Sequence, residues 1–475
     1  MAFNSYDFLL FVTVVYLLYY FLARQWQVWA LLFAGLFFYG YAHPWLLILL
    51  FISASANAVF SYSVYHETSS ARRYLYTFIG VVFNLGILAS FKYNKLMGEF
   101  VSETFIRGHS LLKTLYHLPL PIGISFYTFH GISLILDSGN PENKGRLQID
   151  KSFPRHYLNT FLFINFFPQL VAGPLIKAHN FFPQIGRKLH REIDFEYVFR
   201  NLIAGFFLKC VIADNLKDQT FWITYPYFEF MGSGTLLFLL FGYSMQIFAD
   251  FAGYSLIAIG FAALLGYKLP TNFNFPYIST SITEFWQRWH ISLSSWLKEY
   301  LYFNLGGNRK GRVRTYINLI IVMFLGGLWH GAALSYGVWG LWHGIGLAIE
   351  RAISGRKRGN AERNAFPVAA LKMAFVFCFV SVGWLFFKLT DFSEATLYLK
   401  AIYNNRHIST NRQLVATVLT YSAPVILYHF YYLAKEYRAT WLDLAGRNEY
   451  LAYGTMLFFL VVNRGIPGDF VYFQF

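Results

Sequence analysis

Charged residues are scarce in this chain of 475 residues. Asp, Glu, Lys and Arg together make up 13% of it, about half of the share near 25% that is usual in soluble domains. Hydrophobic residues reach 56% and aromatic residues 21%. A soluble protein of this composition could not cover its surface with polar groups, so we predict that lipid covers part of it. The same composition excludes disordered, collagen-like and coiled-coil proteins.

Cysteine is almost absent. Cys210 and Cys378 are the only two, and both lie in apolar runs. This excludes a disulfide scaffold and a zinc site built on cysteine. No other ligand set suggests a metal, so we expect none. The first apolar run lacks the basic residues and the cleavage site of a signal peptide, and we expect it to remain as an anchor.

Long stretches without charge predict the membrane spans. None of Asp, Glu, Lys or Arg occurs between Arg24 and Glu67, which leaves room for two helices of about 20 residues each. His43-Pro44 is the predicted turn between them, because proline disfavours a helical residue before it. Further apolar runs lie near 5–23, 74–91, 118–137, 157–176, 197–214, 234–249, 251–267, 315–333, 335–350, 368–389, 412–433 and 449–463. We therefore predict an all-α polytopic membrane protein with about 11–13 transmembrane helices.

The basic residues predict the orientation in the membrane. Lys and Arg number 39 against 24 Asp and Glu, so the net charge is +15. The clusters Arg72-Arg73, Arg309–Arg314 and Arg351–Arg363 are the best candidates for cytoplasmic loops, and Arg24 favours an N-terminus outside. The loop near 92–113 mixes both signs and favours neither side. No soluble basic domain is present, so we expect no nucleic-acid partner.

The region 281–346 departs from the lipid-facing pattern. A capping box from Ser281 to Glu284 predicts a helix from Glu284 to about Tyr302. An aromatic stripe follows one face of this helix, and polar residues follow another; the stripe is Trp286, Trp289, Leu293, Trp296 and Tyr300, and the polar face is Gln287, His290, Ser294 and Lys298. The same pattern also suits an interfacial helix with a solvated His290.

His330 lies in the middle of an apolar run and follows Trp329. A histidine at membrane depth is a functional candidate, and nearby glycines allow close approach of a helix or a substrate. The alternative is a neutral histidine that only forms a hydrogen bond across helices. His343 repeats the Trp-His-Gly triplet, but one continuous helix would place it on another face. We expect His343 to pack or to support the site.

Two further features contain charge. Asp250 lies between two apolar runs and needs a partner such as Arg, His or backbone N–H groups, so we favour a structural or orienting role. The glycine-rich loop before residue 315 could hold phosphates through Arg309, Lys310, Arg312 and Arg314. The alternative is an ordinary positively charged cytoplasmic loop. Nucleophile elbows, Walker loops and His-Glu-x-x-His motifs are absent from the sequence.

Several stretches resemble the membrane-bound O-acyltransferase (MBOAT) superfamily, and more closely its bacterial polysaccharide O-acetyltransferase branch, typified by alginate O-acetyltransferase. The matching stretches are Leu120–Phe129, Phe166–Pro174, Gln246–Gly260, Phe285–Ser294, Leu305–Gly311, Gly326–Ala332 and the ending Phe470–Phe475. Three departures from the branch are Ala252 with Leu256, Tyr302 to Asn304, and His130. These changes leave both signature histidines intact and bear on the acceptor.

The resemblance implies a single multi-pass domain over 1–475 with a signature core at about 246–346. Its helices would form a ring around a thinned centre, with a cytoplasmic funnel and re-entrant or interfacial helices. His330 would be the active-site histidine and His290 the second signature histidine. Acetyl from cytoplasmic acetyl-CoA would cross the bacterial inner membrane, and a separate extracytoplasmic partner would complete transfer to a polysaccharide.

Acyl transfer from a thioester to a hydroxyl needs a base and a group that stabilises the oxyanion. We assign His330 as the base, and His290 as an orienting group or a donor to the thioester carbonyl. The candidate substrate contacts are Trp286, Gln287, Trp289, Ser294, Asp250 and Trp329. The candidate contacts for the CoA phosphates are Arg309, Lys310, Arg312 and Arg314. No permanently bound cofactor is expected; acetyl-CoA is the donor, and lipid surrounds the protein.

Two alternatives remain open. The first is a relative that moves D-alanine from a carrier protein to teichoic acid. The second is a transporter or flippase in which His330, His290 and Asp250 form a proton relay.

Overall fold

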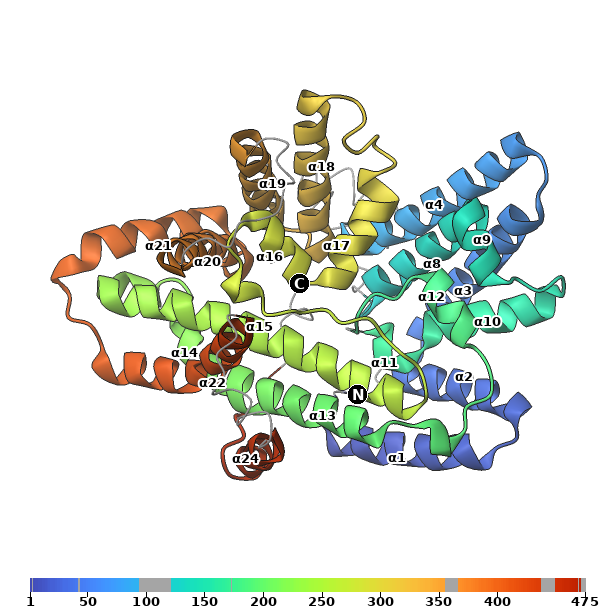
Figure 1. Ribbon diagram of the computed structural model, residues 1–475, viewed down its shortest axis with the longest axis horizontal. Helices are drawn as coiled ribbons and strands as arrows, with labels where there is room; N and C mark the ends of the chain where they lie inside the picture. The colour runs from blue at the N-terminus through green and yellow to red at the C-terminus, as the bar shows by residue number, and fades with distance from the viewer. Residues whose placement is uncertain are drawn as a thin grey trace, which may run out of the picture. The chain divides into compact units, whose positions relative to one another are not determined.

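The computed structural model describes residues 1, 3–41, 43–93, 121–171, 173–354, 366–436, 449–468 and 470. These residues form helices and connecting loops and contain no strand (Figure 1). Leu120, the mixed-charge loop beyond residue 93, the basic residues of 355–363 and residues 471–475 are parts of the sequence predictions that lie outside the described residues. Within the described residues, the predicted all-α class is confirmed.

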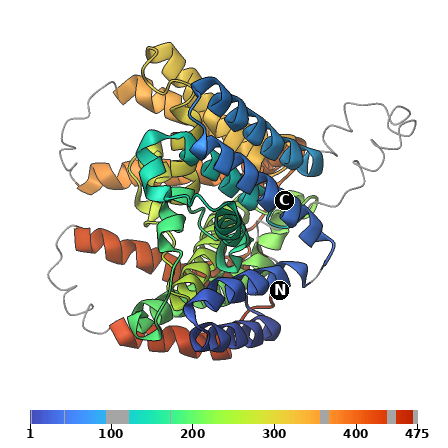
Figure 2. The same ribbon diagram turned by 90° about the vertical axis from the view of Figure 1, so that its right-hand side faces the viewer.

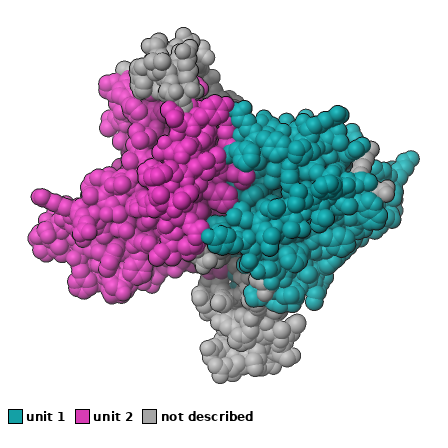
Figure 3. Space-filling model, turned by 90° about the horizontal axis from the view of Figure 1, so that it is seen from below, with its two compact units in different colours: residues 1–199, 257–270 teal, residues 200–256, 271–475 magenta. Residues whose placement is uncertain are grey.

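The chain divides into two compact units, residues 1–199 with 257–270 and residues 200–256 with 271–475 (Figure 3). The first unit contains α1 (Tyr6–Phe21), α2 (Arg24–Gly40), α3 (Leu46–His66), α4 (Ser70–Lys92), α8 (Ile124–Gly139), α9 (Pro141–Leu147), α10 (Phe153–Asn165), α11 (Phe167–Leu170), α12 (Ala178–Phe181), η1 (Phe182–Gln184) and η2 (His190–Glu192). Both α13 (Phe195–Phe206) and α15 (Ser233–Leu264) contribute residues to the two units.

The second unit contains the remaining elements. They are η3 (Phe207–Ala213), α14 (Asp214–Thr220), η4 (Phe221–Ile223), η5 (Tyr227–Phe230), η6 (Pro276–Ile278), α16 (Ile282–Arg288), α17 (Ile291–Leu297), η7 (Lys298–Tyr302), α18 (Arg312–His330), α19 (Leu334–Ser354), α20 (Phe366–Lys388), α21 (Phe392–Asn404), η8 (Asn405–His407), α22 (Arg412–Glu436) and α24 (Glu449–Val462). Both histidines of the candidate catalytic pair, His290 and His330, belong to this unit.

Six described helices are long and apolar enough to cross a membrane. They are Leu46–His66, Ser70–Lys92, Ser233–Leu264, Arg312–His330, Phe366–Lys388 and Arg412–Lys435, and three shorter apolar helices are Tyr6–Phe21, Trp26–Gly40 and Glu449–Val462. The predicted turn at His43-Pro44 is confirmed, because it separates α2 from α3. The chain is therefore a multi-pass membrane protein.

Buried amides hold helices of the first unit together. The chain folds back between α3 and α4, which run side by side (Figure 2). Asn57 on α3 and Asn84 on α4 exchange two amide hydrogen bonds of 3.2 and 2.9 Å. The Ser61 hydroxyl lies 2.8 Å from the Nε2 atom of His156 on α10. Such pairs suit helices in lipid, where a polar side chain has no water to bind.

The apolar runs predicted at 234–249 and 251–267 are one helix and not two spans. Helix α15 continues from Ser233 to Leu264 without a break at Asp250. The prediction was wrong because Asp250 need not reach solvent. Its carboxylate binds the ammonium of Lys209, 2.7 Å away, and is neutralised inside the unit.

Helices α18 and α19 form a tightly packed hairpin (Figure 1). A Cβ atom at Gly327 would lie 2.2 Å from the carbonyl oxygen of Tyr336, and one at Gly340 would lie 2.3 Å from that of Met323. Only glycine permits this approach of the two backbones, so the glycines fix the position of α18 against α19.

A second hairpin leads from His290 to His330. Helix α17 and the π-helical turn η7 run to the loop at 303–311, and α18 returns (Figure 1). Gly306 and Gly307 have φ angles of 100° and 54°, which confirms the predicted tight turn. Helix α18 separates the loop from His330 by roughly 27 Å at 1.5 Å per residue.

Candidate active site

The helix predicted from Glu284 to Tyr302 is broken at His290. Helix α16 ends at Arg288, and α17 begins at Ile291. His290 has φ 43° and ψ 52°, in the left-handed region. That conformation costs a residue with a Cβ atom roughly 1–2 kcal/mol. Sequence periodicity gave no sign of the break, and the prediction of one continuous helix was wrong.

Ser281 begins α16 as predicted. Its hydroxyl accepts a hydrogen bond of 3.0 Å from the N–H of Glu284. The carboxylate of Glu350, on α19, accepts from the N–H groups of Ile282 and Thr283 at 2.5 and 3.2 Å. A carboxylate is favourable at a helix N-terminus because the free N–H groups there carry partial positive charge. Helix α19 is thus joined to the start of the segment that presents His290.

Asn272 holds the break in place. Its carbonyl oxygen accepts from the N–H of Ile291 at 2.9 Å, and its Oδ1 atom accepts from the hydroxyl of Ser292 at 2.6 Å. The same Oδ1 lies 3.3 Å from Nδ1 of His290 and accepts from the N–H of Ser292 at 3.3 Å. An amide oxygen can only accept, so Nδ1 of His290 carries the proton and Nε2 carries the ring's lone pair. Sequence reasoning missed Asn272, because a single Asn in a loop has no periodic signal.

The break also changes which residues share a surface with His290. His290 is 1% exposed, whereas Gln287 and Lys298 are exposed. The predicted common polar face, and the alternative of a solvated His290, were both wrong. The Ser294 hydroxyl donates to the carbonyl of Trp289 at 3.3 Å. Ser294 therefore forms this bond within its own chain segment, with the residue that precedes His290.

The two signature histidines meet at the open end of the second hairpin. Their ring centroids lie 6.5 Å apart. The ring of Trp329 lies 6.2 Å from His290 and 5.0 Å from His330. At these separations one small substrate group can contact both imidazoles. The prediction that residues 40 positions apart share one place is confirmed as geometry; their roles stay predictions.

Aromatic rings enclose His330. Trp339 on α19 and Phe387 on α20 each lie 5.3 Å from its ring, centroid to centroid. All three side chains are buried. Sequence reasoning missed Trp339 and Phe387, although Trp339 lies in the same segment as the second Trp-His-Gly triplet. Such a dry enclosure strengthens electrostatic interactions inside it.

Burial also decides the charge of His290. It lowers the pKa of the His290 imidazole to about 3, because the charged form would lose its hydration. His290 is therefore neutral at pH 7. A neutral ring with its proton on Nδ1 accepts at Nε2. This favours an orienting or proton-accepting role over donation to a thioester carbonyl.

His343 and Trp286 lie behind this enclosure. The indole N–H of Trp286 donates to Nδ1 of His343 at 3.4 Å. Both rings contact Trp339, at 5.6 and 5.0 Å, and Trp339 contacts His330. Trp289 instead packs in the interior, 4.7 Å from Trp384. Among the proposed substrate contacts, Trp329 borders both histidines, Trp286 reaches His330 through Trp339, and Gln287 is exposed.

Asp250 forms a buried ion cluster with two other residues. The ammonium of Lys209 lies 2.7 Å from Asp250 and 2.8 Å from Asp214, and it donates to the carbonyl of Gly468 at 3.1 Å. All three charged side chains are buried. The predicted need for a partner is met by a lysine, which the sequence did not indicate. The arrangement favours the structural role of Asp250.

Replacing Lys209 with Met should destabilise the folded protein by about 3–5 kcal/mol, because two buried carboxylates lose their cation. Thermal unfolding in detergent measures the loss. Lys400→Met is the matched control, since Lys400 is exposed, and it should change stability by less than about 0.5 kcal/mol. Adding Asp214→Asn to the Lys209 variant should restore part of the loss. Wild-type stability of Lys209→Met would contradict the cluster's role.

The basic residues of the loop are exposed. Arg309, Lys310, Arg312 and Arg314 all face outward, and no ion pair joins them to an acidic side chain in the described part of the chain. Arg312 and Arg314 lie in the first turn of α18. Cations there are unfavourable for the helix dipole, so an external anion would relieve them. The loop lies at the far end of α18 from His330.

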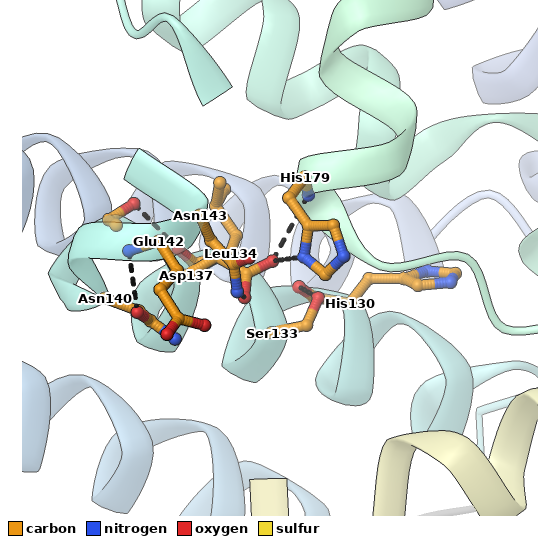
Figure 4. Close-up of polar contacts among 9 residues, drawn as sticks. His130, Ser133, Leu134, Asp137, Asn140, Glu142, Asn143 and His179 are labelled. Carbon is orange, nitrogen blue, oxygen red and sulfur yellow. Dashed lines mark hydrogen bonds and ion pairs between the residues drawn. The ribbon is translucent and has the colours of Figure 1, made fainter. Parts of the chain in front are cut away.

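A separate polar cluster lies in the first unit. Asp137 faces His179, and its Oδ2 atom lies 2.8 Å from Nδ1 of that ring (Figure 4). Oδ1 of Asp137 accepts from the amide of Asn143 at 2.8 Å. His130, one of the departures from the family pattern, lies two turns earlier on α8. Its ring is buried, and neither nitrogen has a hydrogen-bond partner within the described residues.

The long apolar helices and the buried histidine pair define a multi-pass membrane protein whose candidate site suits proton transfer. The sequence profile of the MBOAT (membrane-bound O-acyltransferase) family matches residues 2–390. The chain belongs to this family, and it is an O-acyltransferase. The resemblance seen in the sequence is thereby confirmed, and the transporter alternative is not supported.

Several named relatives are similar to this chain, and three of them represent different activities. The "Probable alginate O-acetylase AlgI" of Pseudomonas aeruginosa is 36% identical over 451 residues, which cover 89% of this chain and 80% of the relative. The "Peptidoglycan O-acetyltransferase" of Helicobacter pylori is 32% identical over 407 residues, 81% of this chain and 75% of the relative. The "Teichoic acid D-alanyltransferase" of Bacillus subtilis is 32% identical over 232 residues, 46% of this chain and 56% of the relative.

Proposed function

We propose that this protein moves acetyl from cytoplasmic acetyl-CoA across or within the bacterial inner membrane, for O-acetylation of an extracytoplasmic polysaccharide. The observation that carries the proposal is the pair His290 and His330, 6.5 Å apart in an aromatic enclosure. The names of the relatives support the acetyl group and a polysaccharide acceptor. A separate extracytoplasmic partner protein would complete the transfer, and the N-terminus would lie outside.

The proposed chemistry needs one proton acceptor. A hydroxyl oxygen attacks the thioester carbonyl carbon while His330 takes the hydroxyl proton. The C–S bond then breaks, and the thiolate leaves with a proton returned from His330. His290 orients the acceptor molecule by accepting a hydrogen bond from it at Nε2. The surrounding rings exclude water, which would otherwise hydrolyse the acyl group.

The basic loop is proposed to bind the phosphates of CoA. Neutralising Arg309 and Lys310 together should raise the apparent KM for acetyl-CoA more than it lowers kcat. The reason is that phosphate contacts, about 27 Å along α18 from the reacting carbon, bind the ground state and the transition state similarly. Steady-state kinetics with acetyl-CoA in vesicles measure both constants. A lowered kcat at unchanged KM would contradict the assignment.

The same loop tests the orientation. Asn308 is exposed at its tip, so a cysteine placed there should react with an impermeant thiol reagent from the cytoplasmic side alone. For the kinetic experiment on Arg309 and Lys310, Lys400→Gln is the control, because it removes a surface charge elsewhere. It should leave the KM for acetyl-CoA unchanged. Labelling of residue 308 only from outside would contradict a cytoplasmic loop.

Transfer itself can be tested with vesicles that contain the purified protein. Radiolabelled acetyl-CoA on one side should give acetyl on the acceptor or partner on the other side, and only in the wild-type protein. D-Alanyl carrier protein as donor tests the alternative. We favour acetyl because the two O-acetyltransferase relatives cover 89% and 81% of this chain, whereas the D-alanyltransferase covers 46%.

A further inference from the structure

The segment that follows α24 is anchored to the second unit at Gly465 and Phe470, which are buried. The N–H of Gly465 donates to the carbonyl of Cys210 at 2.9 Å. The amide of Asn215 donates to the carbonyl of Asn463 at 3.2 Å. A Cβ atom at Gly465 would lie 2.8 Å from the backbone nitrogen of Asn215. This segment, residues 463–468 with Phe470, is therefore built into the fold.

Phe470 is buried against helix α15. Its ring stacks on Tyr254 at 4.4 Å and lies 5.8 Å from Phe251, centroid to centroid. Tyr254 and Phe251 are three residues apart and so share one face of α15. Phe251 in turn lies 4.6 Å from the ring of His290, edge to face. Phe470 thus reaches His290 through a single intervening ring.

The buried ion cluster ties the same segment to the same helix. Lys209 binds both Asp250 and the carbonyl of Gly468. Asp250 precedes Phe251 directly in the chain. Phe251 is therefore fixed at its backbone by the Lys209 cluster and at its ring by Phe470. Its ring has little freedom to leave His290.

We propose that Phe470 is a positioning residue, which holds Phe251 against His290 and thereby fixes the imidazole for acyl transfer. Phe470 touches neither histidine and acts through Phe251. The part of this inference that concerns rate rests on the proposed function. The part that concerns the packing of His290 does not, and the two parts have separate measurements.

The first measurement is kinetic. Phe470→Ala should lower kcat for acetyl transfer by about 10- to 100-fold, since small displacements of a catalytic group have effects of this size. The KM for acetyl-CoA should stay within a factor of two of the wild type, roughly, because its phosphates bind elsewhere. Phe470→Tyr keeps the ring and should restore kcat. Val461→Ala is the control, because Val461 is exposed on α24.

The second measurement reports on His290 without any turnover. Diethylpyrocarbonate modifies accessible neutral imidazoles, and peptide mass spectrometry gives the rate at His290. Phe470→Ala should raise this rate, while Phe470→Tyr and Val461→Ala should keep it at the wild-type level. Thermal unfolding in detergent ensures that the variants are compared as folded proteins.

The outcomes separate the two proposals. If Phe470→Ala speeds up the labelling of His290 while the wild-type protein itself transfers no acetyl, the positioning role is supported and the proposed function is refuted. Wild-type labelling and wild-type kcat in Phe470→Ala would overturn the positioning role. A fall in folded protein, with kcat per folded molecule and labelling unchanged, would also overturn it, because Phe470 would then serve stability alone.

Discussion

The His330→Ala protein should insert into the membrane normally and transfer acetyl about 10²–10⁴ times more slowly than the wild type, which is the usual cost of removing a general base. His330 lies at the end of α18, and the glycine contacts that fix α18 against α19 do not involve its side chain. Folding should therefore survive the change. Acetyl incorporation per folded molecule, measured in vesicles, is the test.

His407→Ala is the matched control, since it removes an imidazole that is exposed in η8. It should transfer acetyl at the wild-type rate. His330→Gln, which keeps a polar side chain of similar reach but no base, should be as slow as His330→Ala. Normal acetyl transfer by either His330 variant would remove His330 from the mechanism.

His290 and His330 should behave as one unit. Each single variant is expected to be badly impaired, and the double variant scarcely worse, because residues that act together in one step have non-additive effects. The replacement at position 290 needs care, since its backbone is left-handed. Asn adopts this conformation more readily than Ala does. His290→Asn therefore removes the ring without the full backbone cost.

The comparison of rates decides between two arrangements. If the two singles multiply to give the rate of the double variant, the histidines serve separate steps and the shared site is refuted. A fully active His290→Asn protein would remove His290 from the site altogether. Acetyl transfer by both singles and the double, at equal amounts of folded protein, gives the answer.

Much of the fold could be predicted from the sequence, because segments that lie in lipid are apolar and lack charged residues. Uncharged stretches must be helical in a bilayer, since every backbone group has to be satisfied within the segment. The turn at His43-Pro44 and the start of α16 at Ser281 were found for similar local reasons. In each case a few neighbouring residues decide the structure.

Contacts between residues far apart in the sequence could not be predicted from it. Asp250 looked like a boundary between spans, but Lys209, 41 positions earlier, neutralises it. The helix through His290 looked continuous, but Asn272, 18 positions earlier, holds the break. Hydrophobic periodicity reports on one element at a time. The residue pairs that changed these predictions lie on different elements.

The histidine pair was predicted correctly as neighbours, yet for a reason that the structure revises. The sequence argument placed His290 on a polar face with Gln287, whereas Gln287 is exposed and His290 is buried. What brings the rings together is the hairpin from α17 to α18. The family resemblance predicted that His290 and His330 act together, and the hairpin from α17 to α18 explains why their rings are close.

The glycine contacts between α18 and α19 have a consequence for motion during turnover. Two backbones that already touch cannot move closer, and prying them apart would expose close-packed surface. His330 and Trp339 should therefore travel as one rigid block. If substrate needs a wider passage, the movement has to come from elements other than α18 and α19.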